Sequence, residues 1–216
     1  MEKFNEKNFD KIKNLNWYPW IGENYTKTQL LLVGESHYED GDEWQLGNKD
    51  TTKTIITKRI NGDRGRLHTN LEKTLLNLEK PSKEQGLNFW KSIAYWNLLQ
   101  RLLDSRKQAD RPKDEDFDMG WKVFFQLIEI LDPKYIVIVG KSSVGRLGNY
   151  LNVNETGWEK NNRDFEAKEK IISLKKGNKT LKLIFIKHAS AFYSYKKWAD
   201  LIKNEHPELS KILLNH

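Results

Sequence analysis

Two apolar runs in this chain each end at a cluster of small, polar and ionisable residues. Residues 29–33 run into residues 34–38 (GESHY), and residues 181–187 run into residues 188–190 (HAS). Short apolar runs that stop at polar residues are typical of buried strands. In α/β folds, the carboxyl ends of such strands lead into loops that form binding sites. The sequence therefore predicts one crevice at the carboxyl edge of a parallel sheet, holding Glu35, Ser36, His37 and His188.

The length and the lack of cysteine limit the class of protein. A chain of 216 residues predicts a single domain, residues 1–216, that is long enough to bury a core. No apolar run reaches membrane-spanning length, and residues 1–13 are too polar for a secretory signal. The absence of cysteine excludes disulfides and cysteine-ligated iron–sulfur clusters. We expect a cytoplasmic monomer with no membrane contact, no cofactor and no metal, because no histidines or carboxylates have a recognisable metal-ligand spacing.

The charge and the aromatic content indicate a polyanionic partner. The net charge is +7, and the chain has eight Trp, eight Tyr and nine Phe. A basic surplus favours nucleic acid because binding releases counterions. Aromatic side chains beside lysine and arginine can stack on bases while the cations hold phosphates, although most aromatic residues pack in cores.

The expected strands and helices alternate, which predicts an α/β fold with a mostly parallel sheet. Residues 135–139 read as a second buried strand, and residues 171–186 read as a hairpin that leads into a third. The helical segments are expected at residues 4–15, 69–78, 82–103, 119–131, 193–206 and 208–214.

A long polar insertion, about residues 40–68, separates the first strand from the next helix. It is weakly periodic apart from a β-prone piece at residues 54–57, and loops of this length are usually functional or disordered. It carries a basic cluster, formed by Lys58, Arg59, Arg64 and Arg66.

Two glycine-containing segments resemble motifs that they do not complete. Residues 140–142 (GKS) resemble the end of a phosphate-binding P-loop, but Tyr135 stands where that motif needs a glycine. The segment can still be a tight strand–helix turn or a phosphate site at a helix N-terminus. Residues 34–38 lack the second glycine of a hydrolase nucleophile elbow, because Tyr38 stands there. A hydrolase that uses Ser36 with His188 remains an alternative.

Asn97 lies in an apolar stretch, residues 93–99. A buried amide must find partners or lower stability. Asn97 is therefore either a residue that satisfies backbone groups or a side chain that offers one donor and one acceptor to the amide-like edge of a ligand.

Taken in order, these segments resemble the uracil-DNA glycosylase superfamily. The first motif of that family follows strand one, often as Gly-Gln-Asp-Pro-Tyr or Gly-Glu-Ala-Pro-Gly, and here it stands as residues 34–38. An asparagine reads the flipped base, and Asn97 matches it. The last motif, often His-Pro-Ser, stands here as residues 188–190. Residues 19–22 (PWIG) resemble the lead-in of divergent bacterial members, so that the likeness runs from about Trp17 to Trp198.

The resemblance implies a three-layer α/β/α domain with a short, mostly parallel sheet, and a site that cleaves an N-glycosidic bond in DNA. Trp20 or Trp44 would stack on the flipped base. The implied catalytic residues are Glu35, Ser36, His37 and His188. The implied base-binding residues are Gly34, Tyr38 and Asn97. The implied DNA-binding residues are Arg64, Arg66, Lys141, Ser142, Ser190, Phe192 and Tyr193, of which Phe192 and Tyr193 would wedge into the gap that the flipped base leaves.

The sequence departs from the family at positions that affect its chemistry. Ser36 replaces the aspartate that helps to activate water, and proline is lost at His37 and Ala189. We therefore expect a DNA glycosylase acting on uracil or on a damaged or modified base. The alternatives are a non-catalytic nucleic-acid-binding module on the same fold and a small-molecule hydrolase that uses Ser36.

Overall fold

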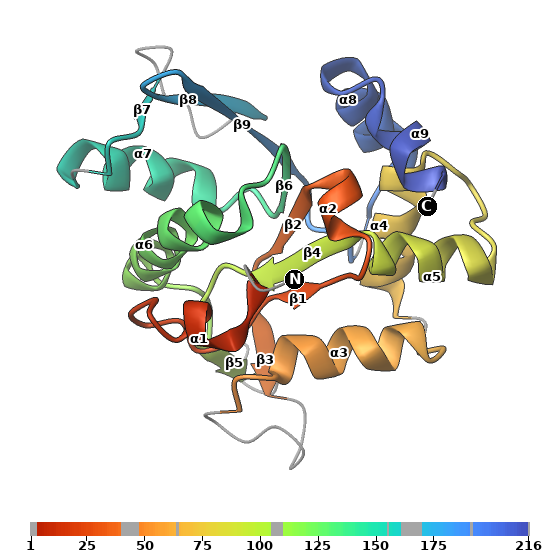
Figure 1. Ribbon diagram of the computed structural model, residues 1–216, viewed down its shortest axis with the longest axis horizontal. Helices are drawn as coiled ribbons and strands as arrows, with labels where there is room; N and C mark the ends of the chain where they lie inside the picture. The colour runs from red at the N-terminus through yellow and green to blue at the C-terminus, as the bar shows by residue number, and fades with distance from the viewer. Residues whose placement is uncertain are drawn as a thin grey trace.

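A seven-stranded sheet runs through the centre of the molecule, and its four middle strands are parallel (Figure 1). The computed structural model describes residues 4–39, 48–63, 65–104, 110–154, 156–160, 170–190 and 192–215. The strand order is β1-β4-β2-β6-β9-β8-β7. The parallel strands are β4 (Ile93–Asn97), β2 (Leu30–Gly34), β6 (Tyr135–Val139) and β9 (Lys179–Ile186). Three strands are antiparallel to their neighbours: β1 (Trp20–Ile21) at one edge, and β8 (Ile171–Lys176) followed by β7 (Glu159–Lys160) at the other.

Successive parallel strands are added to the sheet on opposite sides of β2. From β2 the chain passes to β4 on one side and then returns to β6 on the other side of β2. Connections that leave neighbouring strands toward opposite sides of a sheet open a crevice at the carboxyl ends of those strands. In this protein, that point lies between the carboxyl ends of β2 and β6.

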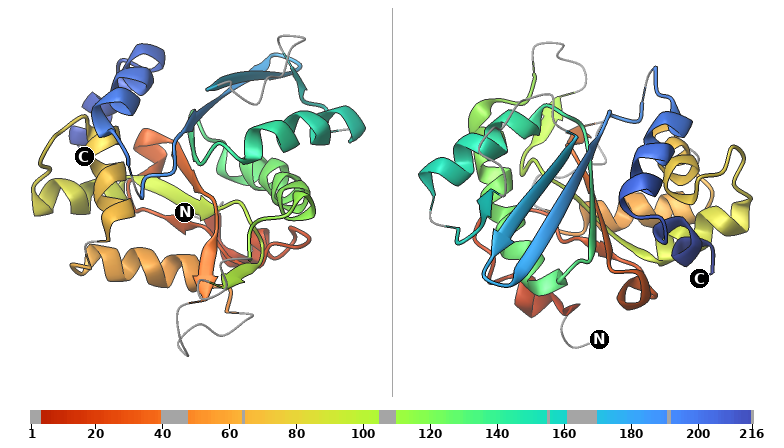
Figure 2. Two further views of the ribbon diagram at one scale, coloured as in Figure 1. Left: turned by 180° about the vertical axis from the view of Figure 1, so that it is seen from behind. Right: turned by 90° about the horizontal axis from the view of Figure 1, so that it is seen from above.

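The two central parallel strands, β2 and β6, are apolar and buried throughout because both of their faces are covered. Every residue of β2 is buried, with Leu31 and Val33 in one core cluster and Leu30 and Leu32 in the other. Strands buried on both faces read as continuous apolar runs. The two layers of helices lie on opposite sides of the sheet (Figure 2), which gives three layers.

The first helical layer packs with Leu31 and includes α1 (Glu6–Phe9), α6 (Asp114–Leu131) and α7 (Ser143–Val153). The other layer packs with Leu30 and contains α3 (Thr51–Ile60), α4 (Arg66–Leu76), α5 (Lys83–Lys91), α8 (Tyr195–Glu205) and α9 (Leu209–Leu214). The short helix α2 (Tyr25–Thr28) precedes β2, and a small parallel pair, β3 (His37–Glu39) and β5 (Leu102–Asp104), lies outside the main sheet.

Most expected elements are confirmed, with shifted ends. The buried strand at residues 135–139 is β6, the hairpin at 171–186 is β8 and β9, and a helix begins after Ser82, which forms a capping box with Gln85. Helices also occupy the expected segments, as α4, α6, α8 and α9.

The prediction of helix across residues 82–103 is wrong beyond Lys91. Residues 93–97 form strand β4, and residues 102–104 form β5. Every residue of β4 is buried, so its apolar pattern has no period that distinguishes a strand from a helix. Pairing with β2 decides the conformation.

The prediction of a β-prone piece at residues 54–57 is also wrong, because these residues lie within α3. The helix buries Ile56 in the core and leaves Thr54 and Thr57 exposed, which shows that tertiary packing outweighs the β preference of branched side chains. Within the described residues, no helix combines the length and the apolar character needed to span a membrane.

Candidate functional site

The carboxyl ends of the parallel strands bring the predicted motifs to one edge of the sheet. Strand β2 ends at Gly34 and β4 at Asn97, and these two residues are register partners. Strands β6 and β9 end together as well, with Val139 opposite Ile186. The residues that follow these four ends are therefore neighbours at the crevice predicted by the order of the strands.

Gly34 and Asn97 fit closely because glycine has no side chain. A Cβ atom at position 34 would lie 2.0 Å from Asn97 Oδ1 and 2.4 Å from the Tyr95 hydroxyl oxygen. The Tyr95 hydroxyl donates a hydrogen bond to Asn97 Oδ1 at 2.9 Å. The amide and the phenol thus occupy the space above Gly34, and no other residue type fits there without displacing them.

Glu35 lies where the chain order opens the crevice. Its side chain is half-buried, and its Oε2 accepts a hydrogen bond from the Ser142 hydroxyl. Gly140 has a φ of +108°, and a Cβ at this position would lie 2.7 Å from Glu35 Oε2. The carboxylate thus lies beside the N-terminus of α7, where the helix dipole favours negative charge. The protein's own carboxylate occupies the place considered for a phosphate.

The next two residues, Ser36 and His37, turn inward. The His37 ring is 4% exposed, its Nε2 lies 2.9 Å from Thr52 Oγ1, and the Trp17 ring packs edge-on against it at 5.1 Å. Burial lowers the pKa of His37 to about 3. Its ring is therefore neutral near pH 7, and its contacts tie the segment after β2 to α3 and to Trp17. The Ser36 hydroxyl oxygen is buried without a hydrogen-bond partner among the described residues.

The segment after β9 is fixed to α4. The Ala189 carbonyl accepts a hydrogen bond from Asn70 Nδ2 at 2.8 Å, and the Tyr193 hydroxyl lies 2.9 Å from Thr74 Oγ1. His188 is half-buried, and its Nδ1 lies 2.9 Å from Ser190 Oγ. Its Nε2 is therefore the ring atom left to meet a ligand. No hydrogen bond joins Ser36 to a histidine in the described part of the chain.

Phe192 and Tyr193 follow this segment and have opposite environments. Phe192 is 97% exposed and has a φ of +50°, a conformation that non-glycine residues rarely adopt. Its carbonyl accepts a hydrogen bond from Lys187 Nζ at 3.0 Å. Burial raises the pKa of Tyr193 to about 12, and its hydroxyl is bound to α4. Only Phe192 is thus free to enter a partner.

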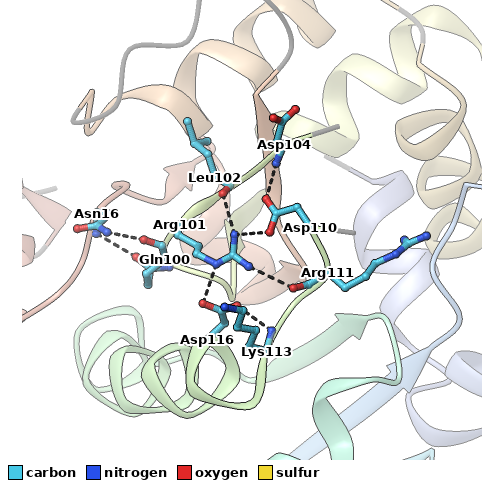
Figure 3. A network of polar contacts seen from close by, with 9 residues as sticks. All are labelled: Asn16, Gln100, Arg101, Leu102, Asp104, Asp110, Arg111, Lys113 and Asp116. Atoms are coloured by element: carbon cyan, nitrogen blue, oxygen red, sulfur yellow. Dashed lines mark hydrogen bonds and ion pairs between the residues drawn. The ribbon is translucent and has the colours of Figure 1, made fainter. Parts of the chain in front are cut away.

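Polar contacts that the sequence did not reveal fix the segment after β4 (Figure 3). Gln100 Nε2 donates to the Asn97 carbonyl at 2.9 Å, and Gln100 Oε1 accepts from the backbone N–H of Asn16 at 2.9 Å. Arg101 forms ion pairs with Asp110 at 2.9 Å and Asp116 at 2.8 Å. No motif in residues 101–118 predicts this network. The one signal was an arginine followed by several aspartates, which is common on solvated surfaces.

The remaining predicted residues lie in varied places. Tyr38 is 43% exposed on β3, and Arg66 is exposed at the start of α4. Trp20 lies on edge strand β1, where its indole donates to the Trp90 carbonyl at 2.8 Å and its ring lines a hollow of about 630 Å³ on the outer side of the strand. That hollow is lined by residues 4–7, Phe9, residues 19–21 and Lys53, and not by the motifs at the strand ends. Trp44 and Arg64 lie outside the described residues.

Arg59 is buried, whereas the basic cluster expected from the sequence would have to be exposed to bind a phosphate. Arg59 is 6% exposed, and its guanidinium pairs with the Glu72 carboxylate, which also accepts a hydrogen bond from the Trp90 indole at 2.7 Å. The charge of Arg59 is therefore used inside the protein and is not available to a phosphate.

No protein-family model matches the chain, and no curated protein matches it. Among the described residues, no three histidine or carboxylate side chains gather in a way that could hold a metal ion. The chemistry offered at this edge of the sheet is a carboxylate, an amide and an imidazole, contributed by Glu35, Asn97 and His188.

Proposed function

We propose that this protein is a DNA glycosylase of the uracil-DNA glycosylase type, which hydrolyses the bond between deoxyribose and a flipped uracil, damaged or modified base. The observation that carries the proposal is the convergence of three motifs at one sheet edge. They occur in the order of that family, and Asn97 lies directly beside Gly34.

The spacing of the strands suits a base held between two side chains. Asn97 is the last residue of β4, His188 lies two residues after the end of β9, and two further strands lie between β4 and β9. Three strand spacings of about 4.8 Å put the two strand ends roughly 14 Å apart. Two side chains with a planar base between them can span such a gap. In this proposal, Asn97 reads the edge of the base, and His188 Nε2 donates to the base oxygen on which negative charge develops.

Glu35 is the residue that we assign to the attacking water. A carboxylate near the sugar accepts a proton from water as the water oxygen bonds to C1′. The N-glycosidic bond breaks, and its electrons leave with the base, where His188 stabilises them. Ser36 stands in place of the family aspartate but keeps its hydroxyl buried, and the neutral His37 ring serves in this proposal to position the loop that carries Glu35.

The surroundings of the crevice suit a polyanion. Lysine side chains lie over aromatic rings on and near α8: Lys73 Nζ is 5.9 Å from the Tyr195 ring, and Lys197 Nζ is 5.5 Å from the Trp198 ring. Exposed Phe192 lies between His188 and this helix in the chain. These features support cations on the phosphates and an apolar side chain that enters the stack.

The proposal is tested with a panel of oligonucleotides, single-stranded and duplex, each carrying one uracil, deaminated, alkylated or oxidised base. Cleavage at the resulting abasic site after alkali reports base loss. We expect at least one substrate to be processed, and His188→Ala to lower its single-turnover rate about a hundredfold, as expected for the loss of one transition-state donor, while DNA binding persists. Ser190→Ala, which removes only the partner of Nδ1, should cost less.

Two outcomes would count against this assignment. DNA binding without cleavage of any substrate would favour a non-catalytic nucleic-acid-binding module. Cleavage at the parental rate by folded His188→Ala would show that the assigned roles are wrong. No observation favours the hydrolase alternative, because the Ser36 hydroxyl is buried and His188 binds Ser190 instead.

A further inference from the structure

A buried phenol lies against the amide that is assigned to reading the base. Tyr95 is 3% exposed and precedes Asn97 by two residues on β4, so that both side chains project from the same face of the strand. Its hydroxyl donates to Asn97 Oδ1 at 2.9 Å. We propose that Tyr95 is a specificity-determining residue that holds the Asn97 amide in one orientation, with its NH₂ group toward the crevice. This inference rests on the proposed function and defines which base edge the site accepts.

The orientation follows from the needs of the phenol. Burial raises the pKa of Tyr95, so the hydroxyl keeps its proton and must place it on an acceptor. Asn97 Oδ1 is the acceptor that the described residues provide. If the amide were rotated by half a turn, its NH₂ group would face the phenol, and the hydroxyl proton would lose its partner in a dry environment.

Gly34 keeps this pair in place from the neighbouring strand. An added Cβ would lie 2.0 Å from Oδ1 and 2.4 Å from the phenol oxygen, so the backbone of β2 forms a wall against both atoms. The Asn97 carbonyl, in turn, accepts from Gln100 Nε2 at 2.9 Å, which fixes the end of the strand. Asn97 Nδ2 has no hydrogen-bond partner among the described residues. It is also not among their unpaired polar atoms that are fully buried, so this nitrogen is not completely enclosed.

The site therefore presents a donor at this point. A base with a carbonyl oxygen at the facing position completes the hydrogen bond, whereas a base with an amino group opposes one donor with another. Leaving buried donors unpaired typically changes affinity by about ten- to a hundredfold. Tyr95 thus selects carbonyl-bearing over amino-bearing base edges without touching the base.

The experiment compares the parental protein with Tyr95→Phe on substrates that differ at one edge. Cytosine carries an amino group where uracil carries a carbonyl, and adenine differs from hypoxanthine in the same way. We expect the ratio of single-turnover rates, carbonyl over amino, to fall at least about tenfold in Tyr95→Phe. Tyr25→Phe is the matched control, since its buried hydroxyl donates to the Leu131 carbonyl at 3.2 Å, at the other end of the sheet, and the ratio should stay parental.

A second measurement does not depend on cleavage or on the variant. In the parental protein, the side-chain NH₂ signal of Asn97 is followed by NMR while millimolar uracil or cytosine is added. We expect uracil to shift this signal and cytosine to leave it in place. Equal shifts with both bases would overturn the inference, as would a parental rate ratio in folded Tyr95→Phe. Selective shifts in a protein that cleaves no substrate would uphold the orientation of the Asn97 amide and reject the glycosylase proposal.

Discussion

At the residue scale, the contact between Glu35 and Ser142 joins the segments that follow the carboxyl ends of β2 and β6, between which the strand order opens the crevice. The hydroxyl donates to one carboxylate oxygen and leaves the other for a ligand. If Glu35 activates water, Glu35→Gln should lower the single-turnover rate at least about a hundredfold, because an amide cannot accept the proton. The fold should persist, since glutamine can still accept from Ser142.

Ser142→Ala is the control for this prediction. It keeps the carboxylate and removes only its hydrogen bond, so its rate should fall far less than that of Glu35→Gln. Equal losses in the two variants would mean that the pair acts as a structural unit, and parental activity in Glu35→Gln would remove Glu35 from the mechanism.

His37 makes a prediction about stability rather than activity. Its pKa is about 3 in the folded protein, because burial disfavours the charged ring, and about 6.5 when the chain is unfolded. Between these values the unfolded state binds more protons, so the free energy of unfolding falls as the pH falls below 6.5. For this one group we expect a loss of about 2 kcal/mol between pH 7 and pH 5.

Urea unfolding at pH 7 and pH 5 measures the effect. His37→Gln keeps a side chain that can bond to Thr52 and should remove this share of the pH dependence. His68, whose pKa is lowered to about 4 by burial and by Arg59, should add a loss of its own, which His68→Gln removes. A pH dependence that is unchanged in both variants would show that folding does not lower the pKa of either ring.

At the scale of elements, the sequence predicts where strands end better than it predicts where they begin. β2, β6 and β9 were predicted because each apolar run stops at glycine, histidine or lysine. Strand β4 was missed because a single residue, Ser92, separates it from α5, and no proline or glycine marks the boundary. Asn97 was nevertheless selected, since a lone amide in an apolar stretch needs a partner in either conformation.

The loop between β9 and α8 is the element that meets the proposed DNA stack. Phe192 is exposed and holds a strained backbone conformation, which would be retained only if other contacts fix the loop. If it fills the gap left by the flipped base, Phe192→Ala should slow cleavage of duplex DNA at least about tenfold, because unstacking costs a few kcal/mol. Cleavage of single strands, which have no stack to open, should change little.

The matched control is Val153→Ala. Val153 is 81% exposed, and it lies at the C-terminal end of α7, about 15 Å along that helix from the crevice. This variant should cleave both substrates at the parental rate. An equal effect of Phe192→Ala on single strands and duplex would mean that the side chain contacts the substrate without acting as a wedge.

At the scale of the whole molecule, the site is a product of strand order. Gly34 and Asn97 are separated by more than sixty positions, and they meet because β4 adds beside β2 in parallel register. Local patterns predicted a common edge but not which strands are neighbours. Nor did they reveal that Tyr95 fills the space above Gly34, because nothing in the sequence distinguishes this tyrosine from the aromatic residues that only pack.

The net charge of +7 should make DNA binding depend on salt. Each phosphate neutralised by a lysine or arginine contributes about 0.9 to the slope of log affinity against log salt concentration. Lys196 and Lys197 are exposed in the first turn of α8, close in the chain to Phe192, and their joint replacement by alanine should reduce that slope by about 1 to 2.

Lys27→Ala is the control, because this exposed lysine lies on α2, which precedes β2 at the opposite edge of the sheet. Fluorescence anisotropy with a labelled duplex at several salt concentrations gives the slopes. Equal slopes in the parental protein and the double variant would place the phosphates on another face, whereas an affinity that does not change with salt would exclude a polyanionic partner and point to a small neutral ligand in the crevice.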